Sequence, residues 1–126
     1  PGEGEDHYHA TLDRVLDIGV DGLKLHPLHV VKHTVLANQW RRGEYQPLTR
    51  EAYIRHAADL VERTPEEIVY HRVTGTAARD ILLAPAWCSQ KWNVLNGIER
   101  ELARRGHRQG QFAGMSWINE EIPDAA

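Results

Sequence analysis

Reactive side chains are densest between residues 71 and 91 of the chain. The candidate cluster within it combines cations, a histidine, a carboxylate, a thiol and an indole: Arg72, Lys91, His71, Asp80, Cys88 and Trp87. An arginine or lysine here would bind an anionic group of a substrate, and a thiol is a conceivable hydrogen-atom donor. The alternative interpretation is structural, with Cys88 as a small buried hydrophobic residue and Lys91 in solvent. In that case Trp87 and Trp92 belong to the core.

A second candidate is the end of a predicted strand over residues 23–26. Apolar and polar residues alternate there, as Leu-Lys-Leu-His, and Pro27 ends the strand. In a βα barrel, alternate side chains face the helices and the lumen, and functional groups gather at the carboxyl ends of the strands. The pattern therefore turns Lys24 and His26 inward and places His26 at the functional rim. The alternative is a structural His26 that bonds a neighbouring carbonyl.

Three histidines in this stretch, His26, His29 and His33, form a set of neutral imidazoles of the kind that binds zinc. The sequence disfavours this site. Pro27 prevents a helix that would place the histidines on one face, and a strand turns successive side chains to opposite sides. No cysteine or carboxylate stands close in sequence to complete the set. His7 and His9 are expected to be solvated, so no metal site is predicted in this chain.

The charge balance argues against a nucleic-acid-binding surface. The 126 residues carry 15 Lys+Arg against 18 Asp+Glu, a formal charge of -3, whereas nucleic-acid binders show a basic excess. The basic run at residues 100–108 is interpreted as a helix end whose cations face the negative pole of the dipole, with a phosphate site as the alternative. DNA is therefore not expected as a partner.

Cysteine usage and the apolar runs indicate the compartment. Cys88 has no partner for an internal disulfide, which is typical of a reducing compartment, so the cytoplasm is expected. No apolar run approaches the ~20 residues of a membrane span, and the acidic N-terminus does not resemble a signal peptide. The chain opens with Pro1 and its one methionine is Met115, so we expect an excerpt of a longer protein.

Apolar periodicity and capping residues predict the elements that position these side chains. Short strands are expected at residues 23–26 and 68–73, and residues 107–126 are expected to form a polar, mobile tail. Helices are expected from Tyr8 to Gly19, from a Thr34 cap to Gly43, from a Thr49 cap to Pro65, as a turn from a Thr76 cap to Leu83, and from Trp92 to Gly106.

This order of helix-strand-helix-helix-strand-helix indicates a mostly helical α/β fold. The two strands should pair in parallel, because a crossover and not a hairpin joins them. Two strands cannot form a sheet with covered edges, so we infer partner strands upstream. Nine apolar residues are expected to be mostly buried: Leu12, Leu16, Leu23, Leu25, Leu60, Val61, Leu95, Ile98 and Leu102.

Several motifs, taken in order, resemble those of a known family. They are PGE at residues 1–3, DGLKLHPLHV at 21–30 with its continuation to Tyr53, HRVTG at 71–75, and AP-WC--KW-VLN-I at 84–98. This order is similar to that in a group of uncharacterised bacterial radical S-adenosylmethionine (SAM) proteins typified by YhcC. That group is related to the radical SAM domain of the Elongator catalytic subunit. His33 and Val35 depart from its pattern, which has glycine and proline there.

The resemblance implies that residues 1–106 are the C-terminal slice of a six-stranded, partial TIM-type barrel with a C-terminal extension. An upstream Cys-x3-Cys-x2-Cys loop would hold a [4Fe-4S] cluster, at which such enzymes reductively cleave SAM to start hydrogen abstraction from a substrate. By the same resemblance, Gly2 lies near the methionyl end of SAM, and His26 and Leu28 lie against its adenine. For Leu28, ordinary core packing is the alternative.

The resemblance also implies what this chain cannot do alone. It has none of the cluster cysteines, so we expect it to be inactive by itself and to have the upstream part of its own barrel as a partner. The substrate is unknown, with tRNA as a candidate by analogy to the Elongator-type enzymes. The alternative function is a non-catalytic RNA- or protein-binding module, and a Cys-x3-Cys-x2-Cys motif upstream would distinguish the two.

Overall fold

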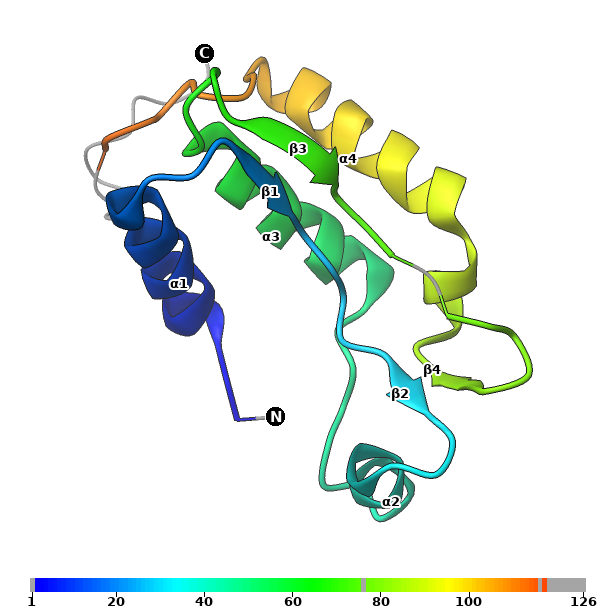
Figure 1. Ribbon diagram of the computed structural model, residues 1–126. Coiled ribbons are helices and arrows are strands. Elements are labelled where there is room, and N and C mark those ends of the chain that lie inside the picture. Colours follow the sequence, from blue (N-terminus) through cyan, green and yellow to red (C-terminus); the bar gives the residue numbers. More distant parts are fainter. Residues whose placement is uncertain (1, 76, 116, 118–126) are drawn as a thin grey trace.

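The structure is a computed structural model that describes residues 2–75, 77–115 and 117. It is a mixed α/β fold that is mostly helical (Figure 1). The elements along the chain are α1 (Glu5–Ile18), β1 (Gly22–Lys24), β2 (Val30–Val31), α2 (Val35–Arg41), α3 (Arg50–Glu62), β3 (Val69–Arg72), β4 (Leu82–Ala84), the 3-10 helix η1 (Ala86–Ser89) and α4 (Lys91–Arg105).

The helix termini follow the capping residues in the sequence. Thr34 and Thr49 each accept a hydrogen bond at 3.1 Å from a backbone N–H three residues on, which caps α2 and α3. Gly106 has φ 72° and ends α4 in the left-handed conformation that glycine adopts without strain. These three termini are confirmed, whereas the expected Thr76 cap lies outside the described residues.

Helices α3 and α4 form the main core. Its buried residues are Tyr53, Ile54 and Ala57 from α3 with Val94 and Ile98 from α4. The two helices approach closely at Gly97, where an added Cβ would lie 2.5 Å from the Ile54 Cδ1 atom. A residue with a side chain at position 97 would therefore push the helices apart.

The alternative interpretation of the 71–91 cluster places Trp92 in the core, and for Trp92 it is wrong. Its side chain is 68% exposed, and it lies beside the Lys91 ammonium group, 5.2 Å from the ring centroid. The buried face of α4 runs through Val94 and Ile98, which are one turn apart. Trp92 precedes Val94 by two residues and so points about 200° away around the helix.

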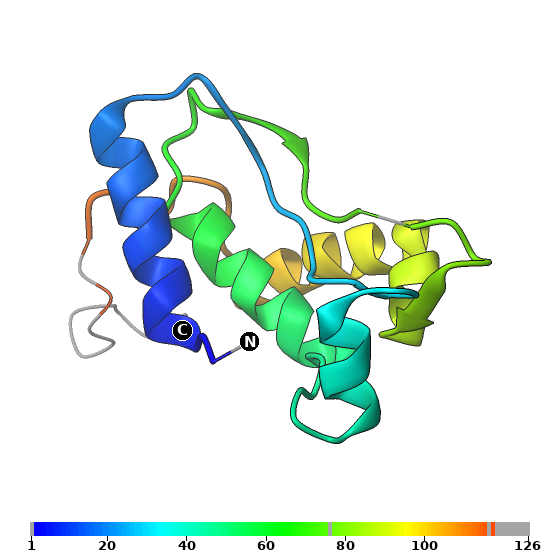
Figure 2. The same ribbon diagram turned by 60° about the horizontal axis from the view of Figure 1, so that its bottom comes forward.

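Strands β1 and β3 pair in parallel, as predicted. Gly22 lies opposite Val69 and Lys24 opposite Arg72, and the ladder continues with the Leu25 N–H donating to the Arg72 carbonyl at 2.8 Å. Figure 2 shows α3 and α4 on one side of this pair. On the other side, Val69 is 58% exposed, so this face is open in the part of the chain that the structure describes.

A second sheet was not predicted. Strand β2 pairs with β4 antiparallel, and Val30, Ala37 and Ala84 form a small core beneath it. The expectation of two strands is therefore wrong, and so is the helical turn expected to reach Leu83. Residues 82–84 are extended because they find a partner in β2, a contact that local propensity does not encode.

Burial of the nine apolar residues is confirmed in part. Leu12, Val61 and Ile98 are buried, and none of the nine is exposed. The other six are half-buried: Leu16, Leu23, Leu25, Leu60, Leu95 and Leu102. Three of these six line the pocket described below, which leaves one side of each without packing atoms.

Residues 107–112 lie against α3. The Phe112 ring is buried, and its backbone N–H donates to the Glu62 carbonyl at 2.9 Å. The Gln109 side chain donates to the Pro65 and Ile68 carbonyls at 3.0 and 2.6 Å. Mobility of the tail stays a prediction, and much of it falls on residue 116 and residues 118–126, outside the described residues.

The basic run at the end of α4 is paired with carboxylates. Arg105 donates to Asp59 at 2.8 Å and to Glu62 and Glu101 at 2.9 Å each, which ties α4 to α3. Hydrogen bonds from Arg104 and Arg105 lower the pKa of Glu101 to about 2. These arginine side chains thus pair with carboxylates of the same chain, and the alternative interpretation of the run as a phosphate site has no support.

No helix among the described residues is long and apolar enough to cross a bilayer. The described strands form two separate two-stranded sheets and no closed barrel, so the barrel slice stays a prediction.

The α3–α4 core should dominate stability. We expect Ile98→Ala to lower the free energy of unfolding by ~2–5 kcal/mol, because it removes a buried side chain and leaves a cavity. Trp92→Ala on the same helix is the matched control and should change it by no more than about 0.5 kcal/mol. Urea unfolding followed by circular dichroism measures both, and equal losses would contradict the assignment of the core face.

Candidate functional site: a pocket at the end of strand β1

A pocket of about 670 Å³ lies between α1, the carboxyl end of β1 and α3. Its wall is rich in leucine: Leu12, Leu23, Leu25, Leu28, Leu48 and Leu60. Gly2 and His26 line the same pocket, so all three residues implied at SAM border one space. We call it the α1–β1 pocket, and its volume is in the range of small-molecule sites, ~300–1,000 Å³.

The chain turns sharply where β1 ends at the pocket. Pro27 is buried, and the His26 Nδ1 lies 2.8 Å from the Pro27 carbonyl oxygen. Because a carbonyl only accepts, Nδ1 carries the proton in this contact and Nε2 is the acceptor of the neutral ring. This is the neighbouring-carbonyl bond of the structural interpretation of His26. The side chain is nonetheless exposed and borders the pocket.

Leu28 is not an ordinary core residue. Its side chain is 49% exposed at the pocket, so the alternative of plain core packing does not describe it. A half-exposed leucine beside an apolar wall offers a surface for an apolar ligand group.

The loop after β3 meets the loop after β1, because the carboxyl ends of parallel strands share one edge. An added Cβ at Gly75 would lie 2.3 Å from the Cδ2 and Nε2 atoms of His26, so the ring packs directly on the Gly75 backbone. The His26 and His29 rings meet edge to face with centroids 4.6 Å apart. The motifs KLHPLHV and HRVTG thus converge at this edge.

Two buried polar atoms at the same edge have no hydrogen-bond partner among the described residues. They are the His29 Nε2 and the Thr74 Oγ1. Burial and the neighbouring His26 lower the pKa of His29, while a backbone hydrogen bond with Gly75 opposes them. Unpaired buried polar groups are rare in folded proteins and mark positions where a ligand or water completes the bonding. Sequence reasoning did not single out either atom for this role.

The reactive run at residues 71–91 is not gathered at the pocket. His71 and Arg72 are exposed on β3, where the His71 ring lies against the β1 backbone, 2.5 Å from where a Cβ at Gly22 would be. Arg72 is the cross-strand neighbour of Lys24, and both are exposed. Two cations side by side on an open face favour an anionic ligand there.

Cys88, Lys91 and Asp80 do not line the pocket. Cys88 is fully buried, and burial raises the pKa of its thiol to about 12, so it is protonated and unreactive at neutral pH. Lys91 and Asp80 are exposed. Trp87 packs on Tyr53 and donates its indole N–H to the Leu48 carbonyl at 2.9 Å, yet it also lines the pocket.

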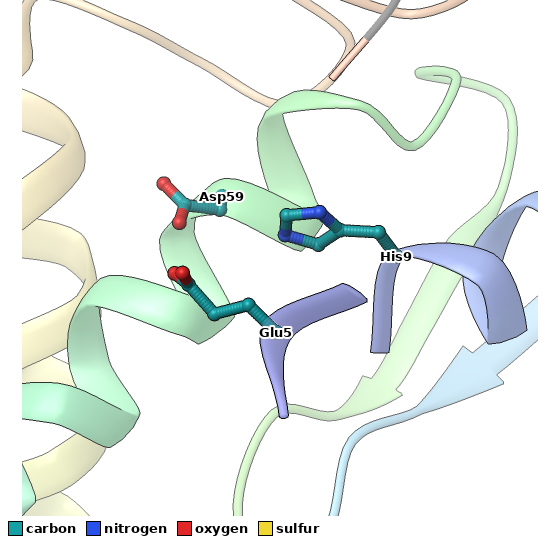
Figure 3. A group of neighbouring side chains, drawn as sticks. All are labelled: Glu5, His9 and Asp59. Carbon is teal, nitrogen blue, oxygen red and sulfur yellow. The ribbon is translucent and has the colours of Figure 1, made fainter. Parts of the chain in front are cut away.

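The three histidines considered for zinc do not converge within the described residues, although His26 and His29 touch. A different group of potential ligands does converge there: Glu5, His9 and Asp59 (Figure 3). The sequence signal is the i, i+4 spacing of Glu5 and His9, which places both on one face of a helix.

Comparison with known proteins identifies the fold family. Residues 20–104 match the family model described as the radical SAM C-terminal domain. The chain belongs to this family. The match runs from β1 to α4 of this radical SAM C-terminal domain, so it includes both motifs that meet at the edge of the pocket. Gly2 and α1 precede it.

Relatives of this radical SAM domain confirm the resemblance drawn from its motifs. It is 41% identical to the protein YhcC of Escherichia coli strain K12 over 118 residues, which are 94% of this chain and 38% of that protein. It is 36% identical to YtqA of Bacillus subtilis strain 168 over 112 residues, which are 89% of this chain and 35% of that protein. The chain thus spans little more than a third of these curated relatives.

A more distant relative carries a specific activity in its name. The chain is 31% identical to the tRNA uridine(34) acetyltransferase of Dehalococcoides mccartyi strain CBDB1 over 108 residues, which are 75% of this chain and 23% of that protein. This agrees with the relation to Elongator-type proteins expected from the sequence.

The residues present do not fit an iron-sulfur cluster. A cluster that keeps one iron open for SAM needs three thiolates, and this radical SAM domain has one cysteine, Cys88. That thiol is buried and protonated. Any such cluster in the longer protein would therefore be held by residues outside this chain.

The contact between Gly75 and His26 can be tested by a double-mutant cycle. Gly75→Ala should displace the His26 ring and break its bond to Pro27, which lowers the free energy of unfolding by about 1 kcal/mol. In a His26→Ala background the same change should cost much less, since the clashing ring is gone. Urea unfolding of the four proteins measures the coupling, and additive losses would contradict the contact.

Proposed function

We propose that this chain is the C-terminal part of a radical SAM enzyme and that the α1–β1 pocket receives part of SAM. The observation that carries the proposal is that Gly2, His26 and Leu28 line one pocket at the carboxyl end of a parallel strand. Carboxyl ends of parallel strands are where βα folds place their ligands.

Within this proposal, the chain contributes binding and not redox chemistry. The leucine wall and the exposed face of Leu28 suit the adenine ring, which is flat and largely apolar. Gly2, which carries no side chain, leaves room for the methionyl end. The [4Fe-4S] cluster, held upstream, supplies the electron for reductive cleavage of SAM, and the protein's part is to orient SAM and exclude water.

The upstream barrel is the proposed partner of the open surfaces. A two-stranded sheet is marginal in water, and β1 and β3 have helices on one face only. The PGE segment ends just before α1, so a strand that precedes it would run parallel to β1 through a right-handed crossover. That strand would also cover part of the apolar wall formed by α1. The whole protein is expected in the cytoplasm, where thiols stay reduced.

For the substrate we propose tRNA. The support is the relative whose name specifies tRNA uridine(34), together with the exposed pair Lys24 and Arg72 on the open face of the sheet. Cations on a strand suit phosphate groups. A net charge of -3 means that most of the affinity for RNA would come from elsewhere in the longer protein.

If this chain contributes to SAM binding and the upstream part of the protein holds the cluster, the isolated chain and the longer protein should differ in activity. After reconstitution with iron and sulfide, the 126-residue chain should stay colourless and form no 5′-deoxyadenosine with dithionite, since three cysteinates are missing. A longer protein that includes the cluster loop should turn brown and cleave SAM. A brown, SAM-cleaving 126-residue chain would refute the proposal, and so would a reconstituted longer protein that leaves SAM intact.

The pocket itself is tested by Leu28→Ala and His26→Ala in the longer protein. Leu28→Ala should weaken SAM binding about tenfold, the equivalent of ~1.4 kcal/mol, because it removes apolar contact with adenine. Val35→Ala is the matched control, since Val35 is 74% exposed and does not line the pocket. Equilibrium dialysis with labelled SAM gives the affinities, and unchanged binding in both pocket variants would place SAM elsewhere.

A further inference from the structure

Two helices bring three potential metal ligands together outside the pocket. Glu5 and His9 lie one turn apart on α1, and Asp59 faces them from α3 (Figure 3). One ligand atom from each residue lies within 4.8 Å of the other two. We propose that Glu5, His9 and Asp59 bind a divalent transition-metal ion, with Zn²⁺ as the representative, between α1 and α3.

The ligand types select the class of ion. One imidazole nitrogen and two carboxylate oxygens suit Zn²⁺ and its first-row neighbours, while Mg²⁺ and Ca²⁺ prefer oxygen alone. Three protein ligands leave a coordination position open for water. Burial lowers the pKa of His9, against the opposing charges of Glu5 and Asp59. A neutral imidazole is the form that ligates metals.

The distances require a small closure. Ligands ~2.0–2.2 Å from a tetrahedral zinc ion are roughly 3.4 Å apart, so atoms within 4.8 Å of one another draw together by at most about 1.4 Å. The Glu5 side chain is 57% exposed and has the freedom to move, while that of Asp59 is only 29% exposed.

Neighbouring side chains already orient each ligand. The His56 Nδ1 lies 3.2 Å from Glu5 Oε1, and Arg105 donates to Asp59 Oδ1 at 2.8 Å. The His9 ring stacks on Trp117 with centroids 3.5 Å apart and planes 6° from parallel. Outer contacts of this kind hold metal ligands in place and raise affinity.

The ion pairs of Glu5 and Asp59 leave carboxylate oxygens for an ion, and the Arg63 guanidinium is a further positive charge near His9 and Asp59. Each of the pairs with His56 and Arg105 engages one oxygen of its carboxylate. They leave the Glu5 and Asp59 carboxylates close together, with the His9 ring beside both (Figure 3). Two carboxylates at this separation repel each other, and a divalent cation converts that repulsion into attraction.

The test is isothermal titration calorimetry of the metal-free 126-residue chain with Zn²⁺. We expect one equivalent to bind, and we expect His9→Ala and Asp59→Asn each to weaken binding by at least about tenfold. Cys88 should not compete, because its thiol is buried and protonated. His33→Asn and Asp17→Asn are the matched controls, since both residues are exposed, and they should leave affinity unchanged.

A second readout separates lost ligation from lost folding. Zn²⁺ should raise the Tm of the wild-type chain above the value measured in a chelator, since a ligand that binds the folded state stabilises that state. In each ligand variant, Zn²⁺ should not raise the Tm above the value that the same variant has in the chelator. The same variants in the longer protein should each lose one equivalent of Zn²⁺ if the isolated chain does not fold. Wild-type and ligand variants that bind Zn²⁺ alike, or a folded wild-type protein that binds none at this site, would overturn the proposal.

Discussion

A parallel strand pair needs a cover on at least one face, and α3 and α4 provide it for β1 and β3. The half-buried Leu25 and Val73 pack on the core between these helices, and the Tyr53 hydroxyl donates to the Val73 carbonyl at 2.6 Å. This anchors the end of β3 next to the end of β1. Because the two strands run the same way, the loops that follow them emerge at one edge, and the pocket and the histidine pair are found there.

Close backbone approach is the second constraint on the fold. At position 97 the missing side chain lets α3 and α4 pack tightly, and at position 75 it makes room for the His26 ring. Both glycines lie outside the left-handed region of backbone conformation, so what matters is the absence of a Cβ atom and not an unusual φ angle. The first supports the core and the second supports the edge where the motifs converge.

The open face of the sheet and the apolar pocket are two separate uncovered surfaces in the described part of the chain. The pocket lies on the face of the strands that α3 covers, where the half-buried Leu23 and Leu25 line it, whereas Val69 is exposed on the opposite face. The chain spans little more than a third of its curated relatives, and under the proposed function SAM enters the pocket while the upstream barrel covers the open face. The proposed metal site lies between the same two helices, α1 and α3, and an ion there would strengthen their contact.

The family, the helix caps and the parallel strands all follow from the sequence alone. Thr34 and Thr49 cap their helices through bonds three residues away, and the length of the connection excludes a hairpin between β1 and β3. These features depend on neighbouring residues or on chain connectivity, which a sequence contains directly. The motif order that indicated radical SAM proteins is of the same kind, and the family match agrees with it.

Which distant residues meet became clear only in three dimensions. Strand β2 has two residues, which is too short to show an apolar periodicity, so its pairing with β4 could not be predicted from the sequence. The exposure of Trp92 depends on which face of α4 meets α3. Likewise, the i, i+4 spacing of Glu5 and His9 gives no sign of the third ligand, because Asp59 reaches them only through the packing of α1 on α3.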